Sequence, residues 1–219
     1  MPAIKDHCPF RYIETGSGCV MSIPDFVTSQ HPKFREAVAA DALATLRYRG
    51  EGSELGTGWR AVRTVIRLVW DADAFFAQVC YRAKTRLQAL GVPLLPRIFH
   101  RLAMMTSQVC IGDPVVIRPG LYLPHGQVVV DGFVTIGEDA VLFPWITIGL
   151  RAGVLQGATI GKDVHVGTGS RIIGPVTIGD HVLIGANAVI NKDVPSRHVA
   201  TGVPASSRPR TDIPQEESS

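Results

Sequence analysis

The sequence predicts an α+β protein in which an N-terminal helical subdomain is followed by a parallel β-helix. The main observation is a branched aliphatic residue at every sixth position, eleven times in succession, at Val130, Ile136, Leu142, Ile148, Val154, Ile160, Val166, Ile172, Ile178, Ile184 and Ile190. A period of six fits neither the helical period of about 3.6 residues nor the two-residue alternation of a strand, so it belongs to a larger coil. Before residue 108, apolar residues recur at helical spacing instead.

The hexapeptide pattern has a direct physical reading. Each six residues make one flat side of the coil, and three sides close one turn. One aliphatic side chain per side points inward and stacks on its counterpart about 18 residues further on. A glycine directly follows six of the eleven aliphatic residues. We expect these glycines to turn the corners, in backbone conformations that a Cβ atom would oppose.

Composition excludes several classes of protein. The chain has 219 residues, of which 46% are apolar and 19% charged, as in an ordinary globular protein. The net charge is +3 and the basic residues are dispersed, so nucleic acid is not an expected partner. Arginines interrupt the longest apolar stretch, 61–70, and no apolar signal segment follows Met1, so we expect no membrane span and no signal peptide. The four cysteines are far apart, which favours a reducing cytoplasm over a disulfide framework.

In chain order, residues 1–30 show no sustained periodicity and are expected to form an extended arm. Residues 31–107 are expected to form the helical subdomain. Its first helix begins near Pro32 and ends at Gly50, with one apolar face formed by Phe34, Val38, Ala42, Leu43 and Leu46.

Three more helices complete the predicted subdomain. The stretch 59–70 has an inward stripe formed by Trp59, Val62, Val65, Ile66 and Val69. Asp71 or Asp73 can cap a third helix that runs to Leu90. The fourth spans 96–107 and turns Ile98, Phe99, Leu102 and Ala103 inward. His100 lies in the same helix and is interpreted as structural.

The β-helix is expected to span residues 108–205. Its first part follows a register one residue out of phase with the later one, at Ile111, Ile117, Leu123 and Val129. The slip falls just after His125, and departures from a repeat tend to mark functional sites. The segment 150–157 is a second irregular point, which can bulge as a loop. Residues 206–219 are rich in serine, proline and charge, and are expected to be disordered.

Four parts of the sequence carry a family resemblance: residues 121–126, the coils themselves, 191–195 and 202–205. Together they resemble the hexapeptide acyltransferases, and among them the serine acetyltransferases. Within residues 70–205, Phe75, Tyr81, Arg82 and His125 are similar to that family in order and spacing. The resemblance implies a left-handed β-helix, acetyl-coenzyme A as donor, and a homotrimer with its site shared between subunits. The helical part could then pair two trimers.

His125 is the candidate general base. An alcohol that attacks a thioester needs a base for its proton, donors for the oxyanion and a groove that positions both partners. A histidine suits this task because its pKa lies near neutrality, and His125 matches the base of the family that the chain resembles. A surface or core-edge histidine is the alternative.

The resemblance also implies a cofactor site. The pantetheine arm would lie along Thr168, Gly169, Gly185 and Ala186, where small residues let the backbone approach a ligand. Arg171 and Lys192 are candidates for the nucleotide phosphates, although both can equally be solvated surface residues.

The chain departs from the serine acetyltransferase pattern around the acceptor. The family's two acidic residues, which hold the serine and orient the base, align with Pro124 and Cys110, and a second histidine has no counterpart in 150–157. Asp113 or Asp131 could orient His125 instead, and Asp131 is a candidate substrate ligand. Phe143 and Trp145 could form the floor of an acceptor pocket, or shield a contact between subunits.

The predicted function is therefore O-acetyl transfer from acetyl-coenzyme A to a small hydroxyl acceptor such as serine. The alternatives are a sugar or natural-product O-acetyltransferase and a non-catalytic trimeric scaffold. A carbonic anhydrase on the same fold would need three converging histidines. His165 and His181 are 16 residues apart, so we expect them not to stack with each other, and we expect no metal.

Overall fold

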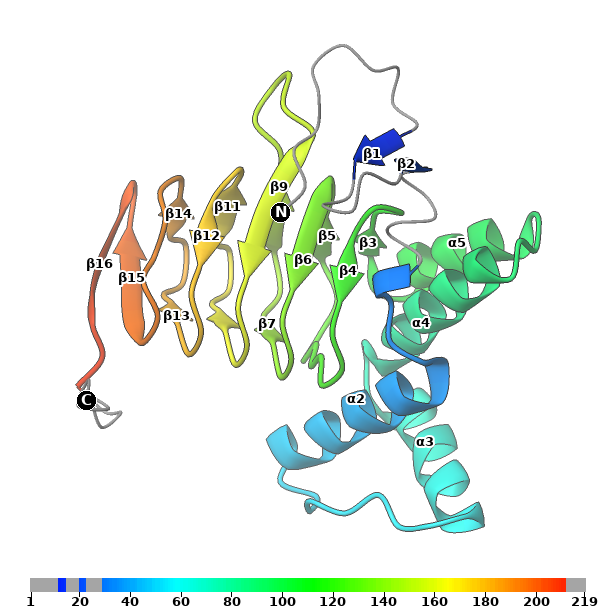
Figure 1. Cartoon of the computed structure of the whole chain (residues 1–219). Coiled ribbons are helices and arrows are strands. Elements are labelled where there is room, and N and C mark those ends of the chain that lie inside the picture. Colours follow the sequence, from blue (N-terminus) through cyan, green and yellow to red (C-terminus); the bar gives the residue numbers. More distant parts are fainter. Residues whose placement is uncertain (1–11, 15–19, 23–28, 212–219) are drawn as a thin grey trace, which may run out of the picture.

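The computed structural model describes residues 12–14, 20–22 and 29–211. A long stack of coils forms one part of the molecule, and the helices pack at the end where the stack begins (Figure 1). The predicted α+β architecture is confirmed. Within the predicted arm 1–30, β1 (Tyr12–Glu14) pairs antiparallel with β2 (Val20–Ser22). The rest of that arm, except residues 29 and 30, lies outside the described residues.

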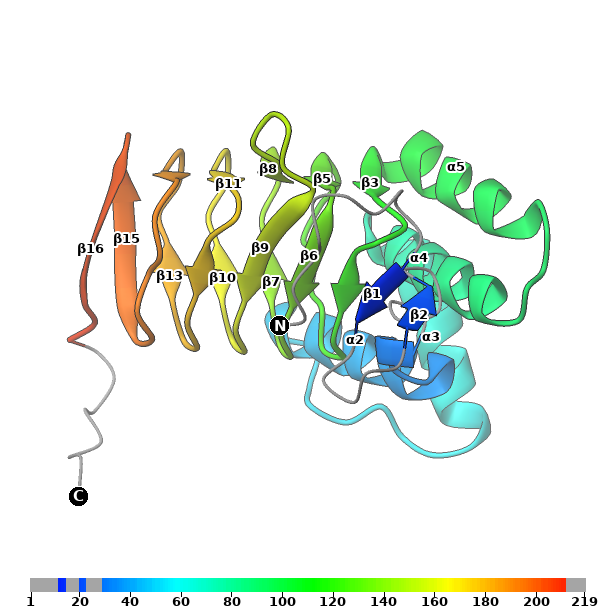
Figure 2. The same ribbon diagram turned by 45° about the horizontal axis from the view of Figure 1, so that its top comes forward.

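Three parallel sheets form the sides of the β-helix, and Figure 2 shows its coils in a row. The first sheet contains β3 (Val109–Ile111), β5 (Val128–Val130), β8 (Ile146–Gly149), β11 (Arg171–Ile173) and β14 (Val189–Ile190). The second contains β4 (Val116–Ile117), β6 (Phe133–Ile136), β9 (Gln156–Ile160) and β12 (Thr177–Ile178). The third contains β7 (Val141–Leu142), β10 (His165–Val166), β13 (Leu183–Ile184), β15 (His198–Gly202) and β16 (Ala205–Pro209).

The last strand closes the stack. β16 returns antiparallel along β15, from Gly202 opposite Ala205 to His198 opposite Pro209. The regular chain therefore runs past residue 205 into the segment expected to be disordered. Residues 212–219 of that segment lie outside the described part of the chain.

Stacked aliphatic residues fill the core as predicted, with one correction. Ile148 stacks on Val130 eighteen positions before it, but its next partner is Ile172, twenty-four positions on. The extra six residues form the exposed loop 150–155, so Val154 faces solvent and is not a core position. An insertion of one whole repeat leaves the period of six unbroken in the sequence, which is why Val154 seemed to fit it.

The one-residue slip is confirmed, and its position can be refined. Ile111 pairs with Val130 and Ile117 with Ile136, nineteen positions apart in both cases. The additional residue lies in the corner 124–127, which contains His125. The predicted inward position of Val129 is wrong, because Val129 is exposed on the outer face while Val128 and Val130 are buried.

The glycines of the repeat act differently from expectation. None of the six glycines that follow a core aliphatic has a positive φ. Left-handed backbone falls at other corner positions, on larger residues such as Asp139 (φ 56°) and Trp145 (φ 66°) and on glycines such as Gly132 and Gly169. Most of these glycines are required by close contact between coils: a Cβ atom on Gly137 would lie 2.4 Å from the carbonyl oxygen of Gly161.

Four helices make up the described helical subdomain, namely α2 (Phe34–Tyr48), α3 (Trp59–Asp71), α4 (Phe75–Ala89) and α5 (Leu95–Ser107). A buried ion pair fixes them to the first coil. Arg82 on α4 donates to both carboxylate oxygens of Asp41 on α2, at 2.8 and 3.0 Å. The same carboxylate accepts the backbone N–H groups of Gly120 and Leu121, while Arg82 also donates to the carbonyl oxygen of Ile117.

The apolar stripe of α3 is not the buried stripe that its spacing predicted. Trp59 is 70% exposed and Trp70 is 90% exposed, and Val62 and Ile66 between them are also exposed. Leu68 is the buried residue of this helix, and Val65 and Val69 pack beside it. None of the helices in the described ranges is long and apolar enough to cross a membrane.

Candidate active site

His125 lies at the corner where the first and third sheets of the β-helix meet. Its Nδ1 atom is 2.8 Å from Oδ2 of Asp73, which lies in the turn between α3 and α4. The end of α5 meets the same corner: the Ser107 hydroxyl donates to the carbonyl oxygen of Asp73, and the backbone carbonyl of Ser107 accepts the N–H of Gln127. The irregular corner and two helix ends thus converge on one imidazole.

This contact assigns the two ring nitrogens of His125. When Nδ1–H donates to the Asp73 carboxylate, Nε2 carries the lone pair and is the atom that can accept a proton. Both side chains are exposed, so the base opens to the surface of the subunit. The arrangement is a carboxylate-oriented histidine, which is the form needed for general base catalysis.

Asp73 is a candidate site residue that sequence reasoning missed. The sequence predicts Asp71 or Asp73 as the cap of this helix, but the N-cap of α4 is Ala74, without a side-chain cap bond. The two aspartates considered as partners of His125 lie elsewhere. Asp113 accepts from Lys84 Nζ at 3.1 Å, and Asp131 follows β5 at the opposite end of that strand from His125.

Most of the predicted site residues share one corner of the coil. We call this the His125 edge, defined by residues 124–127, 143–145, 167–169 and 185–187 in successive coils. Backbone bonds tie its turns together: Trp145 donates its N–H to the carbonyl of Gln127, and Gly169 donates to that of Pro144. The edge brings together His125 with Phe143, Trp145, Thr168, Gly169, Gly185 and Ala186.

Arg171 and Lys192, the two phosphate candidates, are separated by the fold. The guanidinium of Arg171 donates to the carbonyl oxygens of Trp145 and Gly169, so it clamps the His125 edge. Lys192 follows β14 at the other end of the first sheet, the corner that also carries Asp131. Lys192 is exposed there and is not part of the His125 edge.

His165 and His181 do not stack, as predicted, because His165 pairs with Leu183 in the next coil. Both contact one carboxylate, with His181 Nδ1 2.8 Å and His165 Nε2 3.4 Å from the two oxygens of Asp163. His165 Nε2 is also 3.1 Å from the hydroxyl of Tyr48, the last residue of α2. The described residues include no group of three or more His, Cys, Asp or Glu arranged to hold a metal ion.

Three adjoining hollows lie between α5 and the outer face of the first sheet. The first, of 300 Å³, is lined by Asp73 and His125, and it shares Gln108 and Gln127 with a second hollow of 360 Å³. The second reaches Trp145 and Arg171. It shares Cys110 with a third hollow of 660 Å³.

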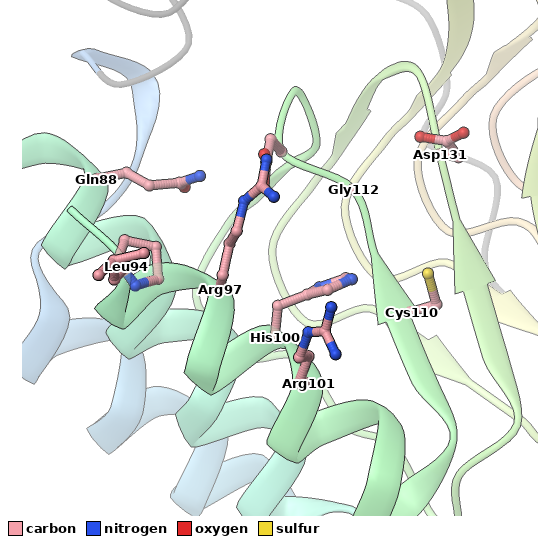
Figure 3. A pocket seen from close by; sticks show the side chains of 10 residues that line it. Gln88, Leu94, Arg97, His100, Arg101, Cys110, Gly112 and Asp131 are labelled. Carbon is pink, nitrogen blue, oxygen red and sulfur yellow. The ribbon is translucent and has the colours of Figure 1, made fainter.

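The third hollow carries most of the charge. His100 and Arg101 project from α5 toward Cys110 across the hollow, and Arg97 rises toward the loop that carries Gly112 (Figure 3). Burial, and then the charge of nearby Lys84, lowers the pKa of His100 below its usual value. Burial, and then the Asp131 carboxylate, raises the pKa of the Cys110 thiol, which makes that thiol a poor nucleophile. Cys80 and Cys110 are free thiols, whereas Cys8 and Cys19 lie outside the described residues.

Comparison with known proteins agrees with this architecture. The family model of the bacterial transferase hexapeptide (six repeats) matches residues 157–192, and that of the hexapeptide repeat of succinyl-transferase matches residues 133–172. The serine acetyltransferase of Helicobacter pylori (strain J99) is 35% identical over 133 residues, which cover 59% of this chain and 77% of that protein.

Two further matches extend the comparison. The serine acetyltransferase of Synechococcus elongatus is 30% identical over 148 residues, or 66% of this chain, and this chain spans only 60% of its length. The crystal structure of soybean serine acetyltransferase complexed with serine superposes with a TM-score of 0.68 at 25% identity, covering 84% of this chain and 72% of the soybean chain.

Proposed function

Because this chain belongs to the serine acetyltransferase family, we propose that it transfers an acetyl group from acetyl-coenzyme A to a hydroxyl group of a small acceptor. The observation that carries the proposal is the contact between His125 and Asp73 at the irregular corner of the β-helix. Serine is the first acceptor to test, since it is the acceptor named for the relatives.

The proposed reaction needs no covalent enzyme intermediate. His125 Nε2 takes the proton of the acceptor hydroxyl as the oxygen attacks the thioester carbonyl. The tetrahedral intermediate collapses, the carbon–sulfur bond breaks, and the imidazolium returns its proton to the departing coenzyme A thiolate. The Asp73 carboxylate holds Nδ1–H and stabilises the imidazolium while the proton resides on the ring.

The donor would lie along the His125 edge. Thr168, Gly169, Gly185 and Ala186 follow one another on neighbouring coils, so an extended pantetheine arm can run past their backbone amides. The guanidinium of Arg171 donates to two carbonyl oxygens of this edge, which favours a role in holding the edge in place over a role in phosphate binding. Lys192 follows β14 at the opposite corner of the coil, and its role as a phosphate ligand stays a prediction.

The acceptor pocket favours a second candidate function beside serine acetylation. Pro124 and Cys110 stand where the resemblance places acidic groups that grip the amino group of serine. Trp145, exposed beside Gln127, offers an apolar ring face of the kind on which a sugar ring packs. A sugar or natural-product hydroxyl is therefore the alternative acceptor, and a non-catalytic trimeric scaffold is the alternative to catalysis.

We expect a homotrimer as the working unit. The openness of His125 and Asp73 on a single subunit supports a site that a neighbouring subunit completes. The exposed stripe Trp59, Val62, Ile66 and Trp70 supports pairing of two trimers through α3. Nucleic acid and membrane are not expected partners, and the cytoplasm remains the location expected from the composition.

The deciding experiment measures release of free coenzyme A from acetyl-coenzyme A in the presence of L-serine or a panel of sugars. We expect turnover by the wild type, and a loss of about 100-fold to 10,000-fold in His125→Ala. His198→Ala is the matched control, because His198 lies on β15 and contacts the carbonyl of Ser196 instead. Turnover that survives His125→Ala would remove the base from the mechanism. A wild type inactive with every acceptor would favour the scaffold.

A further inference from the structure

The 660 Å³ hollow beside α5 has no role in the acetyl transfer described above. Its α5 wall is basic, with Arg97, His100 and Arg101 on one helix face, one turn apart. The opposite wall is the outer face of the first two coils, at Cys110 and Asp131 (Figure 3). The three side chains come from one helix and line the same hollow, and the two guanidinium groups carry its positive charge.

The hollow belongs to a row of three neighbouring hollows that ends at the corner holding His125. It shares Cys110 with the middle hollow, and the middle hollow shares Gln108 and Gln127 with the one that holds His125. The floor of this groove follows β5, and the four residue steps from Gln127 to Asp131 span about 13 Å at 3.3 Å per residue. A single elongated molecule can therefore reach from His125 to the arginines of α5.

The charges of the groove select an anion. Lys84, buried beneath the floor, donates to the carbonyl of Ile111 and pairs with Asp113, which neutralises that carboxylate. Neither Arg97 nor Arg101 forms an ion pair with any residue in the described ranges. Two exposed guanidinium groups thus face one remaining carboxylate, Asp131, and leave an excess of positive charge.

We propose that this hollow binds a phosphate or carboxylate group of the acceptor, whose hydroxyl lies at His125. The inference rests on the proposed acetyl transfer and narrows its substrate class to elongated anionic alcohols, such as sugar phosphates. A guanidinium group binds both anions through paired N–H bonds, and two of them one helical turn apart match a phosphate. Asp131 is placed to accept a hydroxyl hydrogen of the same ligand. The anionic group at the far end of the acceptor would anchor it in place of the amino group, for which the acidic ligands are missing at Pro124 and Cys110.

The test compares acceptors that differ only in the anion and are long enough to span about 13 Å: maltose with maltose 1-phosphate, and N,N′-diacetylchitobiose with its 1-phosphate. We expect the wild type to have a lower KM for each phosphorylated member. In the double variant Arg97→Ala/Arg101→Ala, that KM should rise by about 10-fold to 100-fold, since hydrogen bonds to a charged group are lost. The kcat, the KM for acetyl-coenzyme A and the KM for the uncharged acceptors should stay unchanged.

Controls separate the possible results. Arg97→Lys/Arg101→Lys should restore part of the preference, and Arg60→Ala/Arg63→Ala on exposed α3 should leave it intact. Two results would overturn the proposal. One is an alanine variant that keeps the preference for phosphorylated over uncharged acceptors. The other is an alanine variant in which the KM for acetyl-coenzyme A rises instead, because the arginines would then bind an anion of the donor.

A calorimetric titration covers the case in which no acceptor is turned over. The full chain is titrated with inorganic pyrophosphate, and this readout does not depend on catalysis. Binding that Arg97→Ala/Arg101→Ala abolishes would support the anion site even if the proposed function failed. Equal binding by wild type and variant, or no binding by either, would count against the site.

Discussion

The buried pair of Asp41 and Arg82 allows a quantitative test of how the helices are held on the β-helix. Asp41 is 1% exposed and Arg82 is 2% exposed. Four donors converge on the Asp41 carboxylate: two guanidinium nitrogens of Arg82 and the N–H groups of Gly120 and Leu121. Asp41→Ala would leave a buried guanidinium charge and two amides without their acceptor. We expect the free energy of unfolding to fall by about 3 to 5 kcal/mol.

Urea unfolding followed by far-UV circular dichroism, at one fixed protein concentration, measures this loss. The double variant Asp41→Leu/Arg82→Met removes both charges and should recover much of it, because an apolar pair of similar volume leaves no buried charge unpaired. A loss below about 1 kcal/mol in Asp41→Ala would refute the reasoning, since exposed pairs have values of that size. The reasoning would also be refuted if the double variant lost as much free energy of unfolding as the two single variants, Asp41→Leu and Arg82→Met, lose together.

Four further predictions follow from the contacts. Gly137→Ala should lower the Tm, because its Cβ would lie 2.4 Å from a backbone oxygen, while Gly149→Ala, with a nearest atom at 3.6 Å, should be nearly neutral in the same thermal melt. Burial, and then the charge of Arg82, lowers the pKa of His31 to about 4, so the folded state resists protonation and stability should fall as the pH drops from about 6.5 to about 4. Urea titrations at pH 7 and 4.5 should show that slope, and His31→Phe should flatten it. Asp73→Asn should lower kcat by on the order of 100-fold and change the pH profile of kcat, with partial recovery in Asp73→Glu. Deletion of residues 150–155 should leave the Tm almost unchanged, whereas deletion of 151–155 should shift the register and unfold the later coils.

The sequence allowed the β-helix to be predicted almost residue by residue, because stacking requires the same side chain type at the same position of every coil. Ile148, Ile172 and Ile190 could be assigned to the core from their spacing alone. The loop 150–155 could not be detected in this way. It adds one full repeat, so it leaves the phase of the pattern unchanged.

The rest of the site depends on distant segments. Asp73 comes 52 residues before His125, and nothing in a periodic pattern connects a turn between helices with a corner of the coil. An aspartate before a helix usually indicates a cap, and this local interpretation gives no sign of the contact between Asp73 and His125. The exposure of Trp59 and Trp70 was equally hidden, because an amphipathic pattern indicates an apolar face but not which chain covers it.

His125 and Asp73 belong to different subdomains, so their contact exists only while the helices are docked on the first coils. Under the proposed mechanism, activity therefore depends on the docking of the helices on the coils. On heating, the helical unit can detach while the stacked coils persist, and activity would then be lost before the β-sheet signal changes. A ligand or neighbouring subunit that tightens docking would raise activity without touching the imidazole.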